Sequence, residues 1–389
     1  MRILSFSYCF PSHARPIWGV FVFQRLAAMA AREEVRVVAP VPSFPLVTRF
    51  RGWPGPPVED WQGLAVHRPR FLYLPGVWKS LDGRLYARGL RRWLGRFVAD
   101  WQPDVLDAHF EWPDGVGVAL LAKRLGLPYA ITLRGKIYPC LEAPPQRRQC
   151  AEALGGAAAV ISVNAPMAEI ARRLGAPADR VHVIPNGVDV VRFRPADRSA
   201  ARRELGLPEQ GRLLVTVAHL GQRKGHRETI QALARLPADV RLVLVGGDPE
   251  GGRSRRELQG LARRLRLDGR VSMVGPQPYD VVPLYFNAAD VSVLASWREG
   301  CPNVVLESLA SGTPVVASDV GGVSAMIEDG GNGKIVPPRQ VEPLAKAIQT
   351  VLDSPPSPQQ VRNSPAVRSW ENVATAVCEV LRRGSVRCR

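Results

Sequence analysis

The stretch SWREGCPNVVLESLASGTPVVASDVGG, residues 296–322, alternates short apolar runs with loops of glycine and other small residues. The apolar run directly before it, Val291–Ala295, predicts a buried strand, and a helix is expected to begin at about Asn303, directly after Pro302. The run Pro314–Asp319 predicts the next strand. A strand, a loop, a helix and a second strand in this order predict a unit of parallel α/β structure.

The same alternation extends along most of the chain. Two series of strands are predicted, separated by the turn-rich segment 185–200. Residues 41–63 are expected to form an irregular loop, and the last helix is expected to begin at about Val367. The other predicted strands are Met1–Tyr8, Val35–Pro40, Val105–Phe110, Tyr129–Leu133, Ala158–Asn164, Val181–Pro185, Arg212–Leu220, Val240–Gly247 and Val271–Gly275. A chain of 389 residues is long enough for two domains, so we expect two Rossmann-like domains facing each other across a cleft.

The composition is that of a soluble folded protein, with 46% hydrophobic and 22% charged residues. No stretch reaches the roughly 18–20 apolar residues that span a bilayer. The six cysteines are scattered, without the spacing of a zinc site or of a disulfide framework. We therefore expect no metal site and a reducing, cytoplasmic location.

The net charge of +17 is high for a chain of this class. A strongly basic protein attracts nucleic acid, anionic lipid or phosphorylated ligands, but a genome that favours Arg and Pro codons produces the same excess. Both explanations stay open. No recognised nucleic-acid module is present, so no nucleic-acid partner is expected.

Residues 68–101 combine many basic residues with aromatic ones and predict an amphipathic helix. Such a helix either lies on an anionic membrane or packs on a sheet with a solvated basic face, and the sequence does not separate the two. Its predicted apolar face consists of Leu85, Leu90, Trp93, Leu94 and Phe97, and its basic face of Arg84, Arg88, Arg91, Arg92 and Arg96.

The helix expected at Asn303 would begin just beyond the carboxyl end of a strand, where ligands bind in open α/β sheets. A helix start offers free N–H groups and a partial positive charge, which suit a pyrophosphate. Glu299 lies in the loop before the helix and Glu307 about one turn into it, so the two carboxylates flank the phosphate position. There they can accept hydrogen bonds from sugar or ribose hydroxyls.

Five motifs in order make the chain resemble the retaining glycosyltransferases of family four, which have the two-domain GT-B fold. The donor-site motif is EGCPNVVLE with the following LASGTPVVASDVGG, within residues 296–322. Before it in the chain lie PNGVD (185–189), VAHLGQRKGH (217–226) and LVLVGGDPE (242–250), and before these lies the pair DAHFEWPDG (107–115) and TLRGK (132–136). The last pair is similar to the branch that builds bacterial cell-surface polysaccharides of the teichuronic acid type. The resemblance implies an N-terminal acceptor-binding domain of residues 1–190, to which a C-terminal helix of residues 367–389 returns, and a donor-binding domain of residues 191–366.

The resemblance assigns roles at the donor site. Lys224 and Arg223 would neutralise the donor diphosphate, and His219 stands where many relatives carry an arginine. Glu307 would hold the ribose hydroxyls, and Glu299 the transferred sugar. The same sugar would also be held by the backbone of Gly300, Cys301, Pro302 and Asn303. Gly246 would let the nucleoside approach a strand end.

In the first half, Gly19 would let a diphosphate approach the start of a helix, and His109 and Arg134 would act at the ends of two strands. Two positions depart from the family pattern. Ile137 stands where relatives carry an aspartate, and Ser324-Ala325 where they carry Pro-Glu. These departures point either to an altered acceptor or to a weak or inactive enzyme.

The resemblance implies a metal-independent retaining glycosyltransferase that uses no cofactor. It would move a sugar from a nucleoside diphosphate sugar to a glycan or a lipid-linked acceptor in cell-surface polysaccharide synthesis, in the cytoplasm or at the inner face of the membrane. The alternatives are a nucleotide-sugar epimerase of similar architecture, a non-catalytic homologue, and a nucleic-acid-binding protein suggested by charge alone.

Overall fold

The computed structural model describes residues 1–44 and 56–386 and divides into two compact units. The first unit contains Met1–Asn186 together with the C-terminal helix from Trp370, and the second is Gly187–Ser369. The boundaries expected from the sequence were 190 and 367. The backbone N–H of Val188 donates to the carbonyl of Arg368 at 2.8 Å, which places both connecting segments in the second unit.

The first unit is built on an eight-stranded sheet in the order β10-β9-β8-β7-β1-β2-β5-β4, parallel except for β4. Its strands are β1 (Arg2–Phe6), β2 (Glu34–Val38), β4 (Val58–Trp61), β5 (Leu64–His67), β7 (Val105–His109), β8 (Tyr129–Leu133), β9 (Ala159–Ser162) and β10 (Val181–Val183). Two short strands, β3 (Val41–Ser43) and β6 (Arg70–Leu72), pair beside it.

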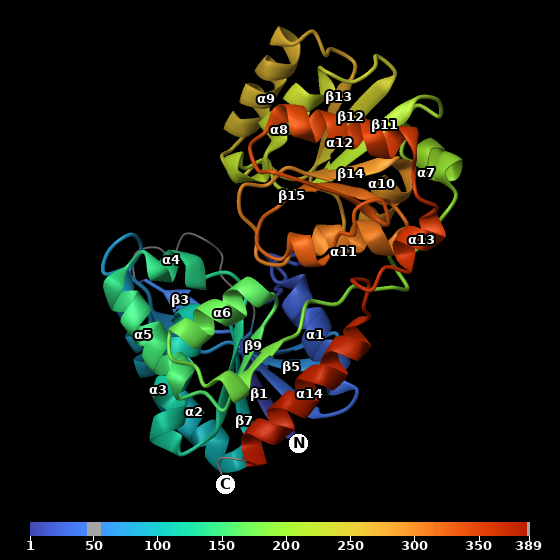
Figure 1. Ribbon diagram of the computed structural model, residues 1–389. Helices are drawn as coiled ribbons and strands as arrows, with labels where there is room; N and C mark the ends of the chain where they lie inside the picture. The colour runs from blue at the N-terminus through green and yellow to red at the C-terminus, as the bar shows by residue number, and fades with distance from the viewer. Residues whose placement is uncertain (45–55, 387–389) are drawn as a thin grey trace. The chain divides into compact units, whose positions relative to one another are not determined.

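The helices of this unit cover both faces of the sheet (Figure 1). They are α1 (Val20–Ala30), α2 (Asp82–Trp101), α3 (Val116–Leu125), α4 (Ile137–Leu141), α5 (Pro144–Gly155), α6 (Ala165–Arg173) and α14 (Trp370–Val386), with the short helical turns η1 (Lys79–Leu81), η2 (Glu111–Gly115) and η3 (Ala178–Arg180). The C-terminal helix α14 packs beside α1, so the predicted return of the chain end to the first unit is observed.

The second unit is a six-stranded parallel sheet in the order β13-β12-β11-β14-β15-β16 with a buried apolar layer on each face. Its strands are β11 (Arg212–Val217), β12 (Val240–Val245), β13 (Val271–Gly275), β14 (Val291–Leu294), β15 (Val315–Ser318) and β16 (Gly333–Val336). Its helices are α7 (Arg198–Glu204), α8 (His226–Leu233), α9 (Arg253–Arg264), α10 (Val282–Ala288), α11 (Asn303–Ala310), α12 (Val341–Asp353) and α13 (Pro358–Arg362), with the turns η4 (Gln222–Lys224) and η5 (Val323–Ala325).

Every predicted strand is present, with ends shifted by a few residues, and the two parallel-sheet units confirm the predicted fold class. The prediction of an irregular loop over residues 41–63 is wrong at β3 and β4, which are strands. Residues 45–55 of this segment lie outside the described residues. The sequence analysis also missed β16, because Gly333-Lys334 opens a run with only two apolar residues after it.

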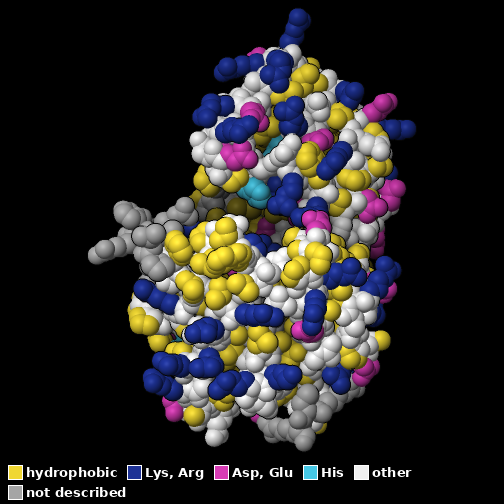
Figure 2. Space-filling model, turned by 90° about the vertical axis from the view of Figure 1, so that its left-hand side faces the viewer, with side chains coloured by type: hydrophobic (Ala, Val, Ile, Leu, Met, Phe, Trp, Pro, Cys, Tyr) yellow, Lys and Arg dark blue, Asp and Glu magenta, His cyan; other side chains and the backbone are white. Residues whose placement is uncertain are grey.

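The apolar face of helix α2 packs against the rest of the first unit. Leu90 and Leu94 are fully buried, and the helix packs against α3 and β6. Trp93 stacks on Phe97 with ring centroids 5.0 Å apart, and His67 packs edge-on against Phe97. The exposed face carries the predicted arginines, so α2 is an amphipathic helix packed on its own unit, without a free apolar face for a lipid layer. Figure 2 shows basic side chains spread over this side of the first unit.

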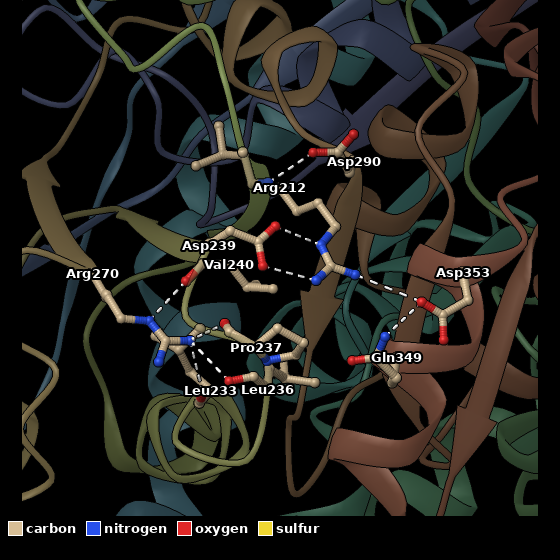
Figure 3. A network of polar contacts seen from close by, with 12 residues as sticks. Arg212, Leu233, Leu236, Pro237, Asp239, Val240, Arg270, Asp290, Gln349 and Asp353 are labelled. Carbon is tan, nitrogen blue, oxygen red and sulfur yellow. Dashed lines mark hydrogen bonds and ion pairs between the residues drawn. The ribbon is translucent and has the colours of Figure 1, made fainter.

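Arginines and aspartates hold the amino ends of the strands in the second unit (Figure 3). Arg212 donates twice to the carboxylate of Asp239, at 2.9 Å each, and Asp290 accepts the N–H of Leu213 at 2.7 Å. Arg270 donates to backbone carbonyls, including that of Val240 at 2.9 Å. These contacts stabilise the edge of the sheet opposite to the one where strand ends offer a ligand site.

A buried ion pair links α1 to the centre of the first sheet. The guanidinium of Arg25 lies 3.1 and 3.2 Å from the two carboxylate oxygens of Asp107 and donates to Thr132 Oγ1 at 2.8 Å. Arg25 is 2% exposed and Asp107 is fully buried. Burial acts to raise the pKa of Asp107, but Arg25 and then His109 outweigh it and hold that pKa below its usual range.

The substitution Asp107→Asn should destabilise the first unit by about 3–5 kcal/mol, because it leaves the Arg25 charge buried without its counterion. Urea unfolding followed by circular dichroism measures the change. The control is Glu152→Gln, which removes the exposed ion pair between Arg148 Nε and Glu152 Oε1, 2.9 Å apart. Loss of this pair should lower the free energy of unfolding by less than about 1 kcal/mol. Equal effects of the two substitutions would show that the buried pair contributes no more than a surface pair.

Candidate functional site

The second sheet has one point at which its strand order reverses, between β11 and β14. The loops that follow these two strands leave the same edge and lead to helices on either side, which is where open parallel sheets bind ligands. Lys224 follows β11 in the turn η4, and Glu299 follows β14. The two side chains form an ion pair of 2.7 Å across the reversal point and are only 21% and 12% exposed.

Two glycines allow the loops at this edge to pack closely. Gly225 has φ 69°, and a Cβ there would lie 1.8 Å from the carbonyl oxygen of Ala295. Gly321 has φ 62°, and a Cβ there would lie 2.0 Å from the carbonyl oxygen of Glu299. A side chain at either position would push the Lys224 and Glu299 loops apart, so both glycines are required by the site's geometry.

Helix α11 begins at Asn303, as predicted, and points its first turn at the same loops. Pro302 precedes it with φ −74° and ψ 108°, and no side chain caps the helix start. The backbone of Gly300 is held by the N–H of Gly322, which donates to its carbonyl at 2.9 Å. Gly300, Cys301 and Asn303 are half-buried, and Pro302 is buried. The helix macrodipole places a partial positive charge at this turn, which favours an anion there.

Glu307 lies one turn into α11 with 8% of its surface exposed. Its Oε1 accepts a hydrogen bond from the hydroxyl of Tyr279 at 3.2 Å. Burial raises the pKa of Glu307 to about 7, and the hydrogen bond from Tyr279 opposes this shift only in part. Tyr279, which follows the end of β13, was not predicted as a site residue, although its position after a strand was a signal in the sequence.

The other predicted donor residues also follow strands at this edge. His219 and Arg223 come after β11 and are exposed, and Gly246 comes directly after β12. Partial burial and the neighbouring Lys224 lower the pKa of His219. The carbonyl of Arg223 accepts the N–H of Trp297 at 2.9 Å, which ties the β11 loop to the β14 loop. The structure therefore gathers the predicted donor residues of the second unit at one edge of its sheet, whereas Gly19, also predicted to approach the diphosphate, lies in the first unit.

In the first sheet the strand order reverses between β1 and β7. Gly19 follows β1 and precedes α1, and His109 is the last residue of β7. His109 is fully buried, so its imidazole lies beneath the sheet edge. Its Nε2 lies 3.1 Å from Asp107 Oδ2 and its Nδ1 lies 3.3 Å from Arg134 Nη2.

These contacts determine the proton position on His109. Arginine only donates, so Nδ1 accepts from Arg134 and the proton lies on Nε2, which donates to Asp107. Burial lowers the pKa of His109 to about 3, despite the opposing charge of Asp107. A neutral imidazole of fixed tautomer thus orients Arg134.

Arg134 follows β8 and is half-buried. Its Nη1 donates to Asn186 Oδ1 at 2.9 Å, and its guanidinium lies 5.1 Å from the ring centre of Phe21. Its backbone N–H donates to Glu111 Oε2 at 3.1 Å. The structure brings the predicted residues His109 and Arg134 into contact.

Two buried carboxyl groups were not predicted, and one of them, Glu111, contacts Arg134. Glu111 and Asp114 lie in η2, directly after β7, and burial raises the pKa of Glu111 to about 7 and that of Asp114 to about 8. One oxygen of each has no hydrogen-bond partner within the described ranges. Both belong to the motif DAHFEWPDG, so the signal was present in the sequence. Ile137, the position of the missing aspartate, is fully buried at the start of α4, and Ala325 is exposed in η5.

Among residues 1–44 and 56–386, no group of three or more His, Cys, Asp or Glu side chains is placed to hold a metal ion. The described cysteines form no disulfide. No helix in the described part of the chain is long and apolar enough to cross a membrane.

Two protein families match the chain. The family described as glycosyl transferases group 1 matches residues 197–366, and the glycosyl transferase 4-like domain matches residues 19–187. A glycosyltransferase named for teichuronic acid biosynthesis in Bacillus subtilis (strain 168) is 30% identical over 368 residues, which cover 90% of this chain and 88% of the relative. A D-inositol 3-phosphate glycosyltransferase of Xylanimonas cellulosilytica is 31% identical over an alignment of 401 positions, which covers 95% of this chain and 92% of the relative.

Solved structures share the fold. Sucrose-phosphate synthase from Thermosynechococcus elongatus has a TM-score of 0.81 at 24% identity and covers 98% of both chains. Anabaena HepE in complex with UDP-glucose has a TM-score of 0.76 at 22% identity, covering 98% of this chain and 99% of that one. At these identities the likeness shows the fold alone.

The raised pKa of Glu307 makes the stability of the second unit depend on pH. The folded state holds the proton up to about pH 7 while the unfolded chain loses it near its ordinary value of 4.5, so stability present below pH 4.5 is lost as the pH rises through 7. When the pH rises from 5 to 8, the free energy of unfolding of the Glu307→Gln variant should fall by about 2–3 kcal/mol less than that of the unsubstituted protein. Denaturant unfolding at both pH values measures this. The exposed Glu342→Gln substitution should keep the original pH slope, and an unchanged slope in Glu307→Gln would contradict the assignment.

Proposed function

The chain belongs to the group 1 glycosyltransferases, and on this premise we propose that it transfers a sugar from a nucleoside diphosphate sugar with retention of anomeric configuration. The observation that carries the proposal is the ion pair between Lys224 and Glu299 at the reversal point of the second sheet, next to the uncapped start of α11. Here a cation, an acceptor of sugar hydroxyl hydrogen bonds and the positive end of a helix macrodipole converge.

In the proposed donor complex, the diphosphate lies at the start of α11. Lys224 and Arg223 neutralise its charge, with His219 beside them, and the backbone of Gly300, Cys301, Pro302 and Asn303 borders the transferred sugar. Glu299 accepts hydrogen bonds from that sugar and Glu307 from the ribose, while Gly246 leaves room for the nucleoside. Anabaena HepE, which shares the fold, has been solved with UDP-glucose, and this supports a nucleoside diphosphate sugar as the donor class.

The proposed reaction needs no protein nucleophile. The bond between the anomeric carbon and the phosphate oxygen breaks while the acceptor oxygen attacks from the same face, and the acceptor proton passes to the departing phosphate. The diphosphate gains charge as it leaves, and a fixed cation at that position lowers the barrier by electrostatic stabilisation. The contact with Glu299 holds the Lys224 ammonium at this position before the charge develops. We propose that these cations make the reaction independent of metal ions.

We assign the acceptor to the carboxyl edge of the first sheet, near Gly19 and Arg134. Because His109 is buried and hydrogen-bonded to Arg134, it acts by positioning that guanidinium rather than by touching the substrate. Glu111 holds the backbone of the same turn. The relative named for teichuronic acid biosynthesis supports an acceptor used in cell-surface polysaccharide synthesis, either a glycan or a lipid-linked sugar.

Nucleoside diphosphates should raise the melting temperature of the protein in a thermal-shift screen of UDP, GDP and ADP. Lys224→Ala should weaken binding of the preferred diphosphate by about 10- to 100-fold, because a charge-assisted hydrogen bond contributes about 1.5–3 kcal/mol. Glu307→Ala should abolish the shift, and Lys346→Ala, an exposed lysine of α12, should leave it unchanged.

The outcome of the full reaction separates the remaining alternatives. A glycosylated product with retained configuration supports the proposal, an isomerised nucleotide sugar indicates an epimerase, and donor binding without turnover indicates a non-catalytic homologue. An unchanged thermal shift in both Lys224→Ala and Glu307→Ala would show that the donor site lies elsewhere.

We also propose that the exposed arginines of α2 bind an anionic membrane surface electrostatically, since each basic residue near such a surface contributes about 1 kcal/mol. The protein should sediment with vesicles that contain phosphatidylglycerol but not with phosphatidylcholine vesicles. The double substitution Arg88→Glu/Arg92→Glu should abolish sedimentation. Arg256→Glu/Arg263→Glu in α9 changes the net charge equally and should not. Equal loss in both double variants would indicate an effect of net charge rather than of α2.

A further inference from the structure

The first unit contains a pocket of about 630 Å³ whose walls are mainly apolar. This volume lies within the range of small-molecule sites. The pocket is formed by segments that follow β1, β3, β6, β7 and β8, so it opens at the carboxyl edge of the strands. Its apolar lining includes Trp18, Phe71, Tyr73, Trp112, Pro139 and Cys140.

The floor of the pocket is buried and its rim is exposed. Phe71, Trp112 and Cys140 have 4%, 7% and 3% of their surface exposed, whereas Trp18 has 40%. Other large exposed apolar side chains lie next to Trp18 and Tyr73 in the chain, namely Ile17, Leu72 at the end of β6, Val77 and Trp78. Figure 2 shows hydrophobic side chains gathered on the first unit. Large apolar side chains left exposed around a concave apolar site indicate a ligand with apolar surface.

The polar groups of the pocket lie mostly at its rim and carry an excess of positive charge. Arg15, Lys79 and Lys136 line it together with one acid, Asp82, which forms an ion pair of 3.0 Å with Lys79. Arg15 lies over the ring of Trp18, 5.1 Å from its centre, and Lys136 is exposed at the end of the turn that follows β8. With three cations and one acid, the lining has a positive formal charge and suits an anionic group.

The pocket adjoins the acceptor residues assigned above. Trp18 directly precedes Gly19, and Lys136 follows Arg134 by two residues. A ligand that fills the pocket and reaches its rim therefore ends beside Gly19 and Arg134.

We infer that this pocket holds the apolar chain of an amphiphilic acceptor, whose phosphate lies at the rim near Lys136 and Arg15. This inference rests on the proposed glycosyl transfer, because the pocket is assigned to the acceptor. A saccharide is a poorer occupant, since it would place many hydroxyl groups against apolar walls that offer them few hydrogen-bond partners. An apolar chain leaves no such groups unsatisfied, and its burial is favourable in proportion to its area.

Isothermal titration of the full-length protein with geranyl phosphate, geraniol, inorganic phosphate and maltose tests the inference. Geranyl phosphate should bind, geraniol should bind about tenfold more weakly, and inorganic phosphate and maltose should show no measurable binding. Gln146→Trp, which places a large ring in the pocket from α5, should weaken geranyl phosphate binding at least tenfold. Arg147→Trp, at the next and exposed position outside the lining, should leave it unchanged. Lys136→Ala should weaken binding about three- to tenfold, and Lys346→Ala should not.

Binding of maltose in place of geranyl phosphate, or equal binding of geranyl phosphate to Gln146→Trp and Arg147→Trp, would overturn the inference. UDP titrated into the same samples separates this outcome from failure of the proposed function. Bound UDP without bound geranyl phosphate refutes the amphiphile pocket and leaves the glycosyltransferase proposal standing. Bound geranyl phosphate, sensitive to Gln146→Trp, without any bound nucleoside diphosphate supports the pocket and contradicts the donor site.

Discussion

Two neighbouring parallel strands can be joined only by a crossover that carries the chain back to the edge of the sheet at which the first strand began. The positions of the candidate functional groups depend on this constraint. All loops that follow parallel strands lie at one edge of their sheet, and two of them diverge where the strand order reverses. In the second unit this point lies between β11 and β14, and Lys224 and Glu299 occupy the two diverging loops. In the first unit it lies between β1 and β7, next to His109 and Arg134. The opposite edge of the second sheet carries the arginine contacts of Figure 3, which stabilise the strand starts.

Burial acts to raise the pKa of Asp107, Glu111 and Glu307 alike, and the partner of each carboxyl group decides the net direction of the shift. Asp107 keeps a low pKa because Arg25 lies within 3.2 Å of both its oxygens. Glu111 accepts a hydrogen bond from an N–H and Glu307 from a hydroxyl, but neither forms an ion pair within residues 1–44 and 56–386, so burial raises the pKa of each to about 7. The ionised Asp107 in turn fixes the tautomer of His109, and this makes the imidazole an acceptor for Arg134. A buried ion pair thereby determines the orientation of a guanidinium at the sheet edge.

The sequence predicted the elements whose pattern is local. Buried parallel strands appear as short β-branched runs, and the start of α11 is marked by Pro302 and the loop before it. The family motifs assigned Lys224 and Glu299 to one donor site, and the strand order observed in the structure brings their loops into contact. Three features depended on distant parts of the chain and were missed or left open. Strand β16 is short and opens with Gly333-Lys334, β3 needs β6 as its partner, and the apolar face of α2 is covered by α3 and β6.

The proposed donor and acceptor sites differ in how far a sequence can describe them, and the reason is physical. A diphosphate requires a cation, free N–H groups and a close backbone approach, so the groups proposed to bind it lie in compact motifs within two loops and one helix turn. An apolar pocket requires only shape and exclusion of water, and its walls come from Trp18, Phe71, Trp112 and Cys140, four segments with no shared motif. Ile137 illustrates the difference. Judged against the family pattern it is a lost carboxylate, but in the fold it is a buried side chain in α4, the helix that also supplies Pro139 and Cys140 to the pocket wall. The turn before it is held instead by Glu111, through the backbone N–H of Arg134. The departure at Ile137 is therefore consistent with an acceptor site rebuilt around an apolar ligand, rather than with the loss of a site.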